Sequence, residues 1–137
     1  MFFKKKENKT EDNFLIKVCA LLIHAAKIDE NYTNSEEEII KKTLLELGSN
    51  KNELDKTIKE AKIIEENSNQ ILDFTRKVKN LAEEDKIKII ESLWRIIYSN
   101  KDADIYETNL MRRLAGLLYI DSKTMGDIKN RIQNKKT

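Results

Sequence analysis

The residue types that most often carry enzyme chemistry are scarce in this chain, which has one histidine, His24, and one cysteine, Cys19. A histidine can act as a general base and a cysteine thiolate as a nucleophile, but each needs a partner that activates it. The sequence shows no nucleophile–base–orienter set, and Cys19 lies among apolar neighbours, where a thiol is usually buried and inert. We therefore expect a structural or surface role for His24 and no enzymatic activity. One cysteine and one histidine also cannot form the usual cage of a structural zinc site.

The other side chains that could take part in chemistry are carboxylates and amides that repeat at a fixed spacing. Asp29 and Glu36 are seven positions apart, and Asn100 and Glu107 are also seven apart. Oxygen ligands of these types suit hard cations such as Ca²⁺ or Mg²⁺. A simpler interpretation is also open, because Thr33 followed three positions later by Glu36 is the pattern of a capping box, and Asp29 can solvate a loop.

Neither segment fits an EF-hand. In a loop that starts at Asp29, the position that needs glycine is Asn34, and the position of the bidentate glutamate is Ile40. In a loop that starts at Asp102, the last position is Arg113. Any cation site in this chain would therefore be of another kind.

Apolar side chains recur at three- and four-residue steps through most of the chain, which predicts amphipathic helices. These helices must position the residues named above. The absence of proline and the presence of three glycines also favour long helices with short joints. We predict an all-α fold of about seven helices, over residues 12–28, 34–47, 53–66, a segment after Ser68, 83–99, 105–118 and a segment after Ser122. Thr33 is the expected cap of the second helix, Gly48 its left-handed end, and Asn52 the cap of the third. Trp94 falls on an apolar stripe and is expected in the core.

A single domain is expected, because 137 residues fit one domain and no Pro- or Ser-rich linker divides them. We assign residues 1–11 to a flexible basic N-terminal tail and residues 12–134 to one helical domain. Phe2 and Phe3 beside three lysines leave a weak peripheral membrane contact open. No apolar run is long enough for a transmembrane segment, and no secretory signal is visible.

The net charge argues against nucleic acid as a partner. Lysine and arginine number 26 against 24 aspartates and glutamates, a formal charge of +2. Residues 1–68 carry 12 basic and 14 acidic side chains, and residues 69–137 carry 14 and 10. Neither half is basic enough to indicate binding to a phosphate backbone.

The chain also contains an internal repeat, because the helix–loop–helix unit at 14–47 resembles the one at 85–118. Asp29 and Glu36 match Asn100 and Glu107 at an offset of 71 positions. At the same offset, Ile39–Ile40 match Leu110–Met111, Lys41–Lys42 match Arg112–Arg113, and Leu47 matches Leu118.

This pattern resembles the TerB family, the tellurite-resistance TerB-like helical domains. TerB-like domains look like two such units, each with the pattern Ala-Asp-Gly-x-apolar-x-x-x-Glu between its helices. The corresponding stretches here are Ile28-Asp29-Glu30-Asn31-Tyr32-Thr33-Asn34-Ser35-Glu36 and Ser99-Asn100-Lys101-Asp102-Ala103-Asp104-Ile105-Tyr106-Glu107. Residues 106–118 also look like the second-unit helix of the family, and the resemblance covers about residues 12–120. The chain departs from the pattern at Glu30 and Lys101, which replace the glycines, and at Asn100, which replaces an aspartate.

The resemblance implies a non-enzymatic, cytoplasmic accessory domain of stress-response or envelope-linked systems that docks on protein partners. It also implies a divalent-cation site for Ca²⁺ or Mg²⁺ in the acidic inter-helix loops, with Asp29, Glu36, Asn100 and Glu107 as the candidate ligands. The alternative is a purely structural protein–protein interaction module without a metal, in which these side chains only cap helices and solvate loops.

Overall fold

The computed structural model describes residues 2–27, 33–68, 71–99 and 105–136. These residues form seven α-helices and one 3₁₀ turn and contain no strand, which confirms the predicted all-α fold. The elements are α1 (Phe2–Ala26), α2 (Asn34–Glu46), η1 (Lys51–Glu53), α3 (Leu54–Asn67), α4 (Leu72–Val78), α5 (Glu83–Ile97), α6 (Ile105–Leu117) and α7 (Ser122–Lys136). Within the described ranges, no helix is both long and apolar enough to cross a membrane.

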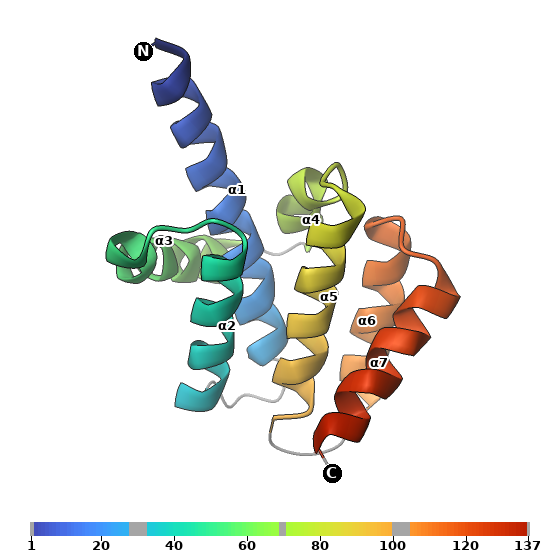
Figure 1. The fold of residues 1–137 in the computed structure, drawn as a ribbon. Coiled ribbons are helices and arrows are strands. Elements are labelled where there is room, and N and C mark those ends of the chain that lie inside the picture. Colours follow the sequence, from blue (N-terminus) through green and yellow to red (C-terminus); the bar gives the residue numbers. More distant parts are fainter. Residues whose placement is uncertain (1, 28–32, 69–70, 100–104, 137) are drawn as a thin grey trace.

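Two helices, α1 and α5, form the middle of the bundle. Helix α1 packs against α2, α3, α4 and α5, and α5 packs against α2 and α7. Figure 1 shows α2 and α3 beside α1, with α6 and α7 beyond α5. From Val18 to Ile23 every side chain of α1 is at most 1% exposed. A helix that is apolar on all sides has to be covered on all sides, so the sequence of α1 requires the central position.

Helix α1 begins at Phe2, earlier than the predicted start near Asp12. Residues 2–11 contain no proline or glycine, and their lysines and glutamates favour helix, so nothing in this segment ends the helix early. In Figure 1 the N-terminal half of α1 extends beyond the neighbouring helices. The segment assigned to a tail is therefore helical from Phe2 onward, while its flexibility stays a prediction.

The internal repeat appears in the structure as two helix pairs whose bounds are shifted by 71 positions. Helix α1 ends at Ala26 and α5 at Ile97, and Asn34–Glu46 of α2 corresponds to Ile105–Leu117 of α6. Equivalent core positions are buried in both units, as shown by Ile40 at 0% and Met111 at 1% exposure. The repeated sequence pattern therefore predicted two equivalent helix–loop–helix units correctly.

The two repeated helices α2 and α6 end in the same left-handed turn but with different residues. Gly48 follows α2 with φ of 103°, as predicted, and Tyr119 follows α6 with φ of 58°. The N–H of the next residue closes each turn on a helix carbonyl, from Ser49 to Leu44 and from Ile120 to Ala115, each at 2.9 Å. This is the Schellman arrangement, in which glycine is the usual left-handed residue. Tyr119 therefore adopts a conformation that is unfavourable for an L side chain.

The predicted cap of the third helix was wrong. Asn52 does not cap α3; instead Asn50 caps the short turn η1, and its side-chain oxygen accepts a hydrogen bond from the Asn52 N–H at 3.1 Å. Glu53, at the N-cap position of α3, makes no side-chain cap bond. The 3₁₀ turn supplies the helix start instead, because it leads directly into Leu54.

A buried lysine in α5 joins the ends of two other helices. Lys86 is 6% exposed, and its ammonium donates to the carbonyl of Leu118 at 3.0 Å and to that of Lys79 at 3.4 Å. These carbonyls end α6 and α4, where free acceptors and the helix dipole favour a positive charge. Lys86 therefore holds α4, α5 and α6 together through polar contacts inside an apolar region.

Replacing Lys86 with methionine should lower the free energy of unfolding by about 2 kcal/mol, because two inward-facing carbonyls lose a charged donor while the apolar stem is kept. Urea denaturation of Lys86→Met, compared with Lys88→Met in the same helix, measures the effect. An equal loss in both variants would contradict the assigned role of Lys86.

Replacing Tyr119 with glycine should raise the free energy of unfolding by about 1 kcal/mol, because glycine adopts positive φ without a steric cost. The reciprocal variant Gly48→Ala should lower it by about 1 kcal/mol, since a Cβ at Gly48 meets nothing within 4 Å and only the backbone conformation is penalised. Thermal melts of both variants test the pair. A lower melting temperature for Tyr119→Gly would show that the tyrosine side chain stabilises the turn by more than its backbone strain costs.

Candidate functional site

The predicted ligand Glu36 lies in the first turn of α2, where it closes a capping box with Thr33. One carboxylate oxygen of Glu36 accepts the Thr33 N–H at 2.7 Å and the Thr33 hydroxyl at 3.0 Å. The Glu36 N–H in turn donates to the Thr33 hydroxyl oxygen at 3.2 Å. The predicted capping box is thus confirmed. Glu36 is only 2% exposed, which is unusual for a charged residue at a helix start.

Glu107 occupies the equivalent position in the second unit, in the first turn of α6. It is 3% exposed, so both repeated glutamates are buried. The other two predicted ligands, Asp29 and Asn100, lie outside the described residues. Among the residues that are described, no three His, Cys, Asp or Glu side chains gather in an arrangement that could hold a metal ion.

A third buried carboxylate, Glu65, joins the end of α3 to the end of α1. One of its oxygens accepts from the Lys27 ammonium at 2.6 Å, and the other lies 3.2 Å from the His24 Nδ1. Glu65 is 9% exposed, and the neighbouring His24 ring lies 6.4 Å from that of Phe74. The hydrogen bond to Glu65 is the main cause that raises the pKa of Lys27. His24 thus has a structural partner, as expected from the sequence.

The polar cleft beside Glu65 is lined by paired charges. It has a volume of about 560 Å³, and its walls come from α1, α2 and α3. The Lys62 ammonium lies 3.3 Å from a carboxylate oxygen of Glu37, and Lys27 pairs with Glu65. Opposite charges that already pair across three helices act as electrostatic links between them.

Cys19 lies in the core. It is fully buried, and its pKa rises from 9.0 to about 12, mainly through desolvation and secondarily through the negative charge of Glu37. A thiol with a raised pKa forms little thiolate near neutral pH, so it is a poor nucleophile. The expectation of a buried, inert thiol agrees with this position.

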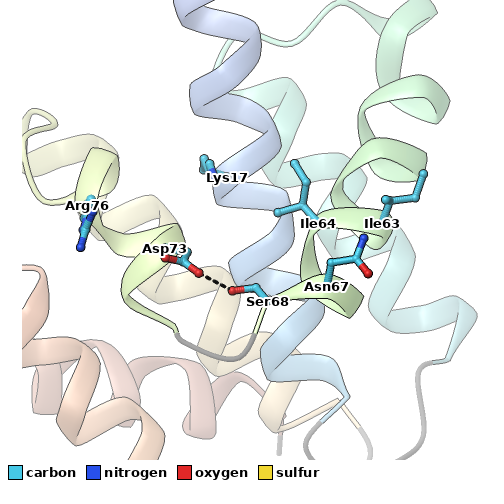
Figure 2. A pocket seen from close by; sticks show the side chains of 7 residues that line it. All are labelled: Lys17, Ile63, Ile64, Asn67, Ser68, Asp73 and Arg76. Carbon is cyan, nitrogen blue, oxygen red and sulfur yellow. Dashed lines mark hydrogen bonds between the residues drawn. The ribbon is translucent and has the colours of Figure 1, made fainter.

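A shallow hollow lies where α1, α3 and α4 meet, and Figure 2 shows the side chains around it. Its volume is about 490 Å³, and Lys17, Ile64 and Arg76 lie on its three walls. The Ser68 hydroxyl donates to the Asp73 carboxylate at 2.6 Å, which ties the end of α3 to the start of α4. The seven lining residues include no histidine or cysteine. We assign this hollow to the joint between α3 and α4.

Comparison with protein-family models identifies the family to which the two repeated units belong. A family model described as "Tellurite resistance protein TerB" matches residues 15–130. The chain belongs to the TerB family. No curated protein and no solved structure matches the chain.

The extent of the TerB match follows the packed part of the molecule. It begins at Leu15, the first buried residue described in α1, and ends inside α7. Both helix–loop–helix units and the loops that contain Asp29 and Asn100 fall within it. The projecting N-terminal half of α1 falls outside the TerB match.

Sequence reasoning missed Glu65 and Lys86 as buried polar residues, although a signal was present. Glu65 continues the apolar stripe of Ile58 and Ala61 at the next helical step, and Lys86 precedes Ile90 by four positions. A charged residue at a stripe position is a candidate for a buried, partnered charge. The identity of each partner depends on other helices and could not be inferred from one sequence.

Replacing Glu65 with glutamine should lower the free energy of unfolding by about 1 kcal/mol, because the side chain keeps its size but loses charge-assisted bonds to Lys27 and His24. The exposed neighbour Glu66→Gln serves as the matched control and should change stability by less than about 0.5 kcal/mol. Chemical denaturation of both variants tests the assignment, and equal effects would contradict it.

Proposed function

We propose that this TerB-family chain is a non-enzymatic binding module of a cytoplasmic stress-response system. In this proposal the module docks on partner proteins, and its acidic inter-helix loops bind a divalent cation, Ca²⁺ or Mg²⁺, through Asp29, Glu36, Asn100 and Glu107. The observation that carries the proposal is the burial of Glu36 and Glu107, at 2% and 3% exposure, in equivalent first turns of α2 and α6.

A buried carboxylate is stable where hydrogen-bond donors, a cation or both satisfy its charge. Both glutamates directly follow the inter-helix loops in which the other candidate ligands lie. A carboxylate can bond donors and a cation together, so capping and ion binding are compatible roles for this residue.

The second candidate function is a purely structural interaction module without an ion. The complete capping box of Thr33 and Glu36 favours it, because this arrangement gives Glu36 a local stabilising role that needs no metal. Exposed apolar side chains such as Ile63, at 52%, and Tyr119, at 69%, would then contribute to partner contacts. The two candidates share partner docking and differ only in the cation.

Thermal melts in EDTA and then in Ca²⁺, Mg²⁺ or Mn²⁺ should separate the two candidates. A cation present at 100 times its Kd adds about 2.7 kcal/mol to stability, which raises the melting temperature by several degrees. The double variant Glu36→Gln with Glu107→Gln should abolish this shift, because glutamine can still close the capping box but carries no negative charge. Asp29→Asn should weaken the shift for the same electrostatic reason.

Glu38→Gln is the matched control, since Glu38 is exposed and lies in the same helix as Glu36. This variant should keep the full cation response. Equal melting temperatures of the wild type in EDTA and in all three ions would contradict the cation proposal and favour the module without metal.

A further inference from the structure

An open groove lies between α6 and α7. Its volume is about 630 Å³, and α5 contributes Trp94 to its wall. Its lining includes Trp94, Met111, Arg112, Gly116, Met125 and Lys129. Arg112 and Gly116 are exposed, so the groove is open to solvent along α6.

Trp94 gives this groove an unpaired hydrogen-bond donor. The residue is 2% exposed, stacks on Tyr98 with ring centroids 5.8 Å apart, and has the Lys129 ammonium 5.5 Å from its ring centroid. Its indole N–H has no hydrogen-bond partner among the described residues. An unsatisfied buried donor costs about 1–3 kcal/mol, and such exceptions call for an explanation.

Glycines on both walls keep the groove wide. Gly116 lies in α6 and Gly126 in α7, and both line the groove. A Cβ at either position would meet nothing within 4 Å, so packing does not require glycine there. Each glycine inside a helix costs about 1 kcal/mol relative to alanine. The chain therefore carries two destabilising residues whose shared effect is to leave space between α6 and α7.

Basic side chains outnumber acidic ones among the residues that line the groove. Arg112 and Lys129 line the groove itself. The one acidic residue that lines the groove, Asp121, accepts the Thr124 N–H at 2.7 Å and so caps α7. An occupant with negative charge would therefore be complementary to this surface.

We propose that the groove between α6 and α7 binds a short acidic peptide segment of a partner protein. An apolar side chain of the peptide would fill the open space beside Gly116 and Gly126, and a carboxylate would lie near Arg112 and Lys129. The unpaired Trp94 N–H would donate to a backbone carbonyl of the peptide. The open shape favours an extended chain over an enclosed small molecule. This inference rests on the proposed docking function and does not depend on the cation.

The test uses the full chain in EDTA and a displayed library of random 12-residue peptides as the probe. Selected peptides should be enriched in Asp and Glu flanking Leu, Met or Phe. The most enriched sequence is then synthesised and titrated into the protein. Trp94 is the only tryptophan, so its fluorescence reports occupancy of the groove directly.

Two pairs of variants locate the binding site. Gly116→Leu should fill the groove and weaken binding at least tenfold while the fold is kept, because the site has space for a Cβ and leucine favours helix. Its control, Asn109→Leu, adds the same side chain to an exposed position of α6 outside the groove. Arg112→Glu should weaken binding at least tenfold, and Arg113→Glu, which does not line the groove, less than threefold.

Several results would overturn the proposal. Selected peptides without acidic enrichment, or affinities unchanged in Gly116→Leu, would remove the groove as the site. Equal losses in Arg112→Glu and Arg113→Glu would indicate unspecific electrostatic attraction. Binding to phosphatidylglycerol vesicles that responds to the same variants, with no peptide selected, would assign the groove to a lipid surface instead. The double variant Glu36→Gln with Glu107→Gln should still bind the peptide in EDTA. That result would support the groove as the peptide site even if the cation proposal failed.

Discussion

The need to cover α1 on every side is the constraint on which the rest of the structure depends. An unbroken run of buried side chains from Val18 to Ile23 leaves this segment of α1 no face for solvent, so α2, α3, α4 and α5 must all pack around it. Each fully buried aliphatic side chain of this kind contributes about 1.5–3 kcal/mol. The equivalent helix of the second unit, α5, is buried over a large part of its surface in the same way. The bundle is therefore organised around two related central helices.

Polar groups inside this bundle are retained where they connect helices. Lys86 donates to carbonyls at the ends of α6 and α4, and Glu65 joins α3 to α1. The hydroxyls of Thr43 and Ser92 form a buried hydrogen bond between α2 and α5. A buried polar group that loses its partner is costly, so each of these contacts favours one arrangement of the helices over others of similar apolar burial. Apolar packing thus supplies the bulk of the stability, and these contacts add specificity.

The two units share a backbone plan but have diverged at their surfaces. Gly48 and Tyr119 occupy the same left-handed turn, yet only the second presents an exposed aromatic side chain at a conformational cost. Gly116 and Gly126 add open space beside this turn. The features proposed for cation binding are common to both units, whereas the proposed peptide groove belongs only to the second. A duplicated scaffold can in this way carry one shared property and one that is specific to a single unit.

The sequence by itself determined the helices, the repeat and the family. Apolar spacing depends only on the helical period, so α2, α5 and α6 could be placed within a few residues, and Thr33 and Gly48 marked local ends of α2 through interactions between neighbouring residues. The start of α1 was less well predicted, because no breaker marks it. Tertiary structure alone decided which helices partner Glu65 and Lys86, and that Trp94 lines a groove with an unpaired N–H. These contacts join residues distant in the chain, and their formation depends on how whole helices pack, which the local pattern of one helix does not specify.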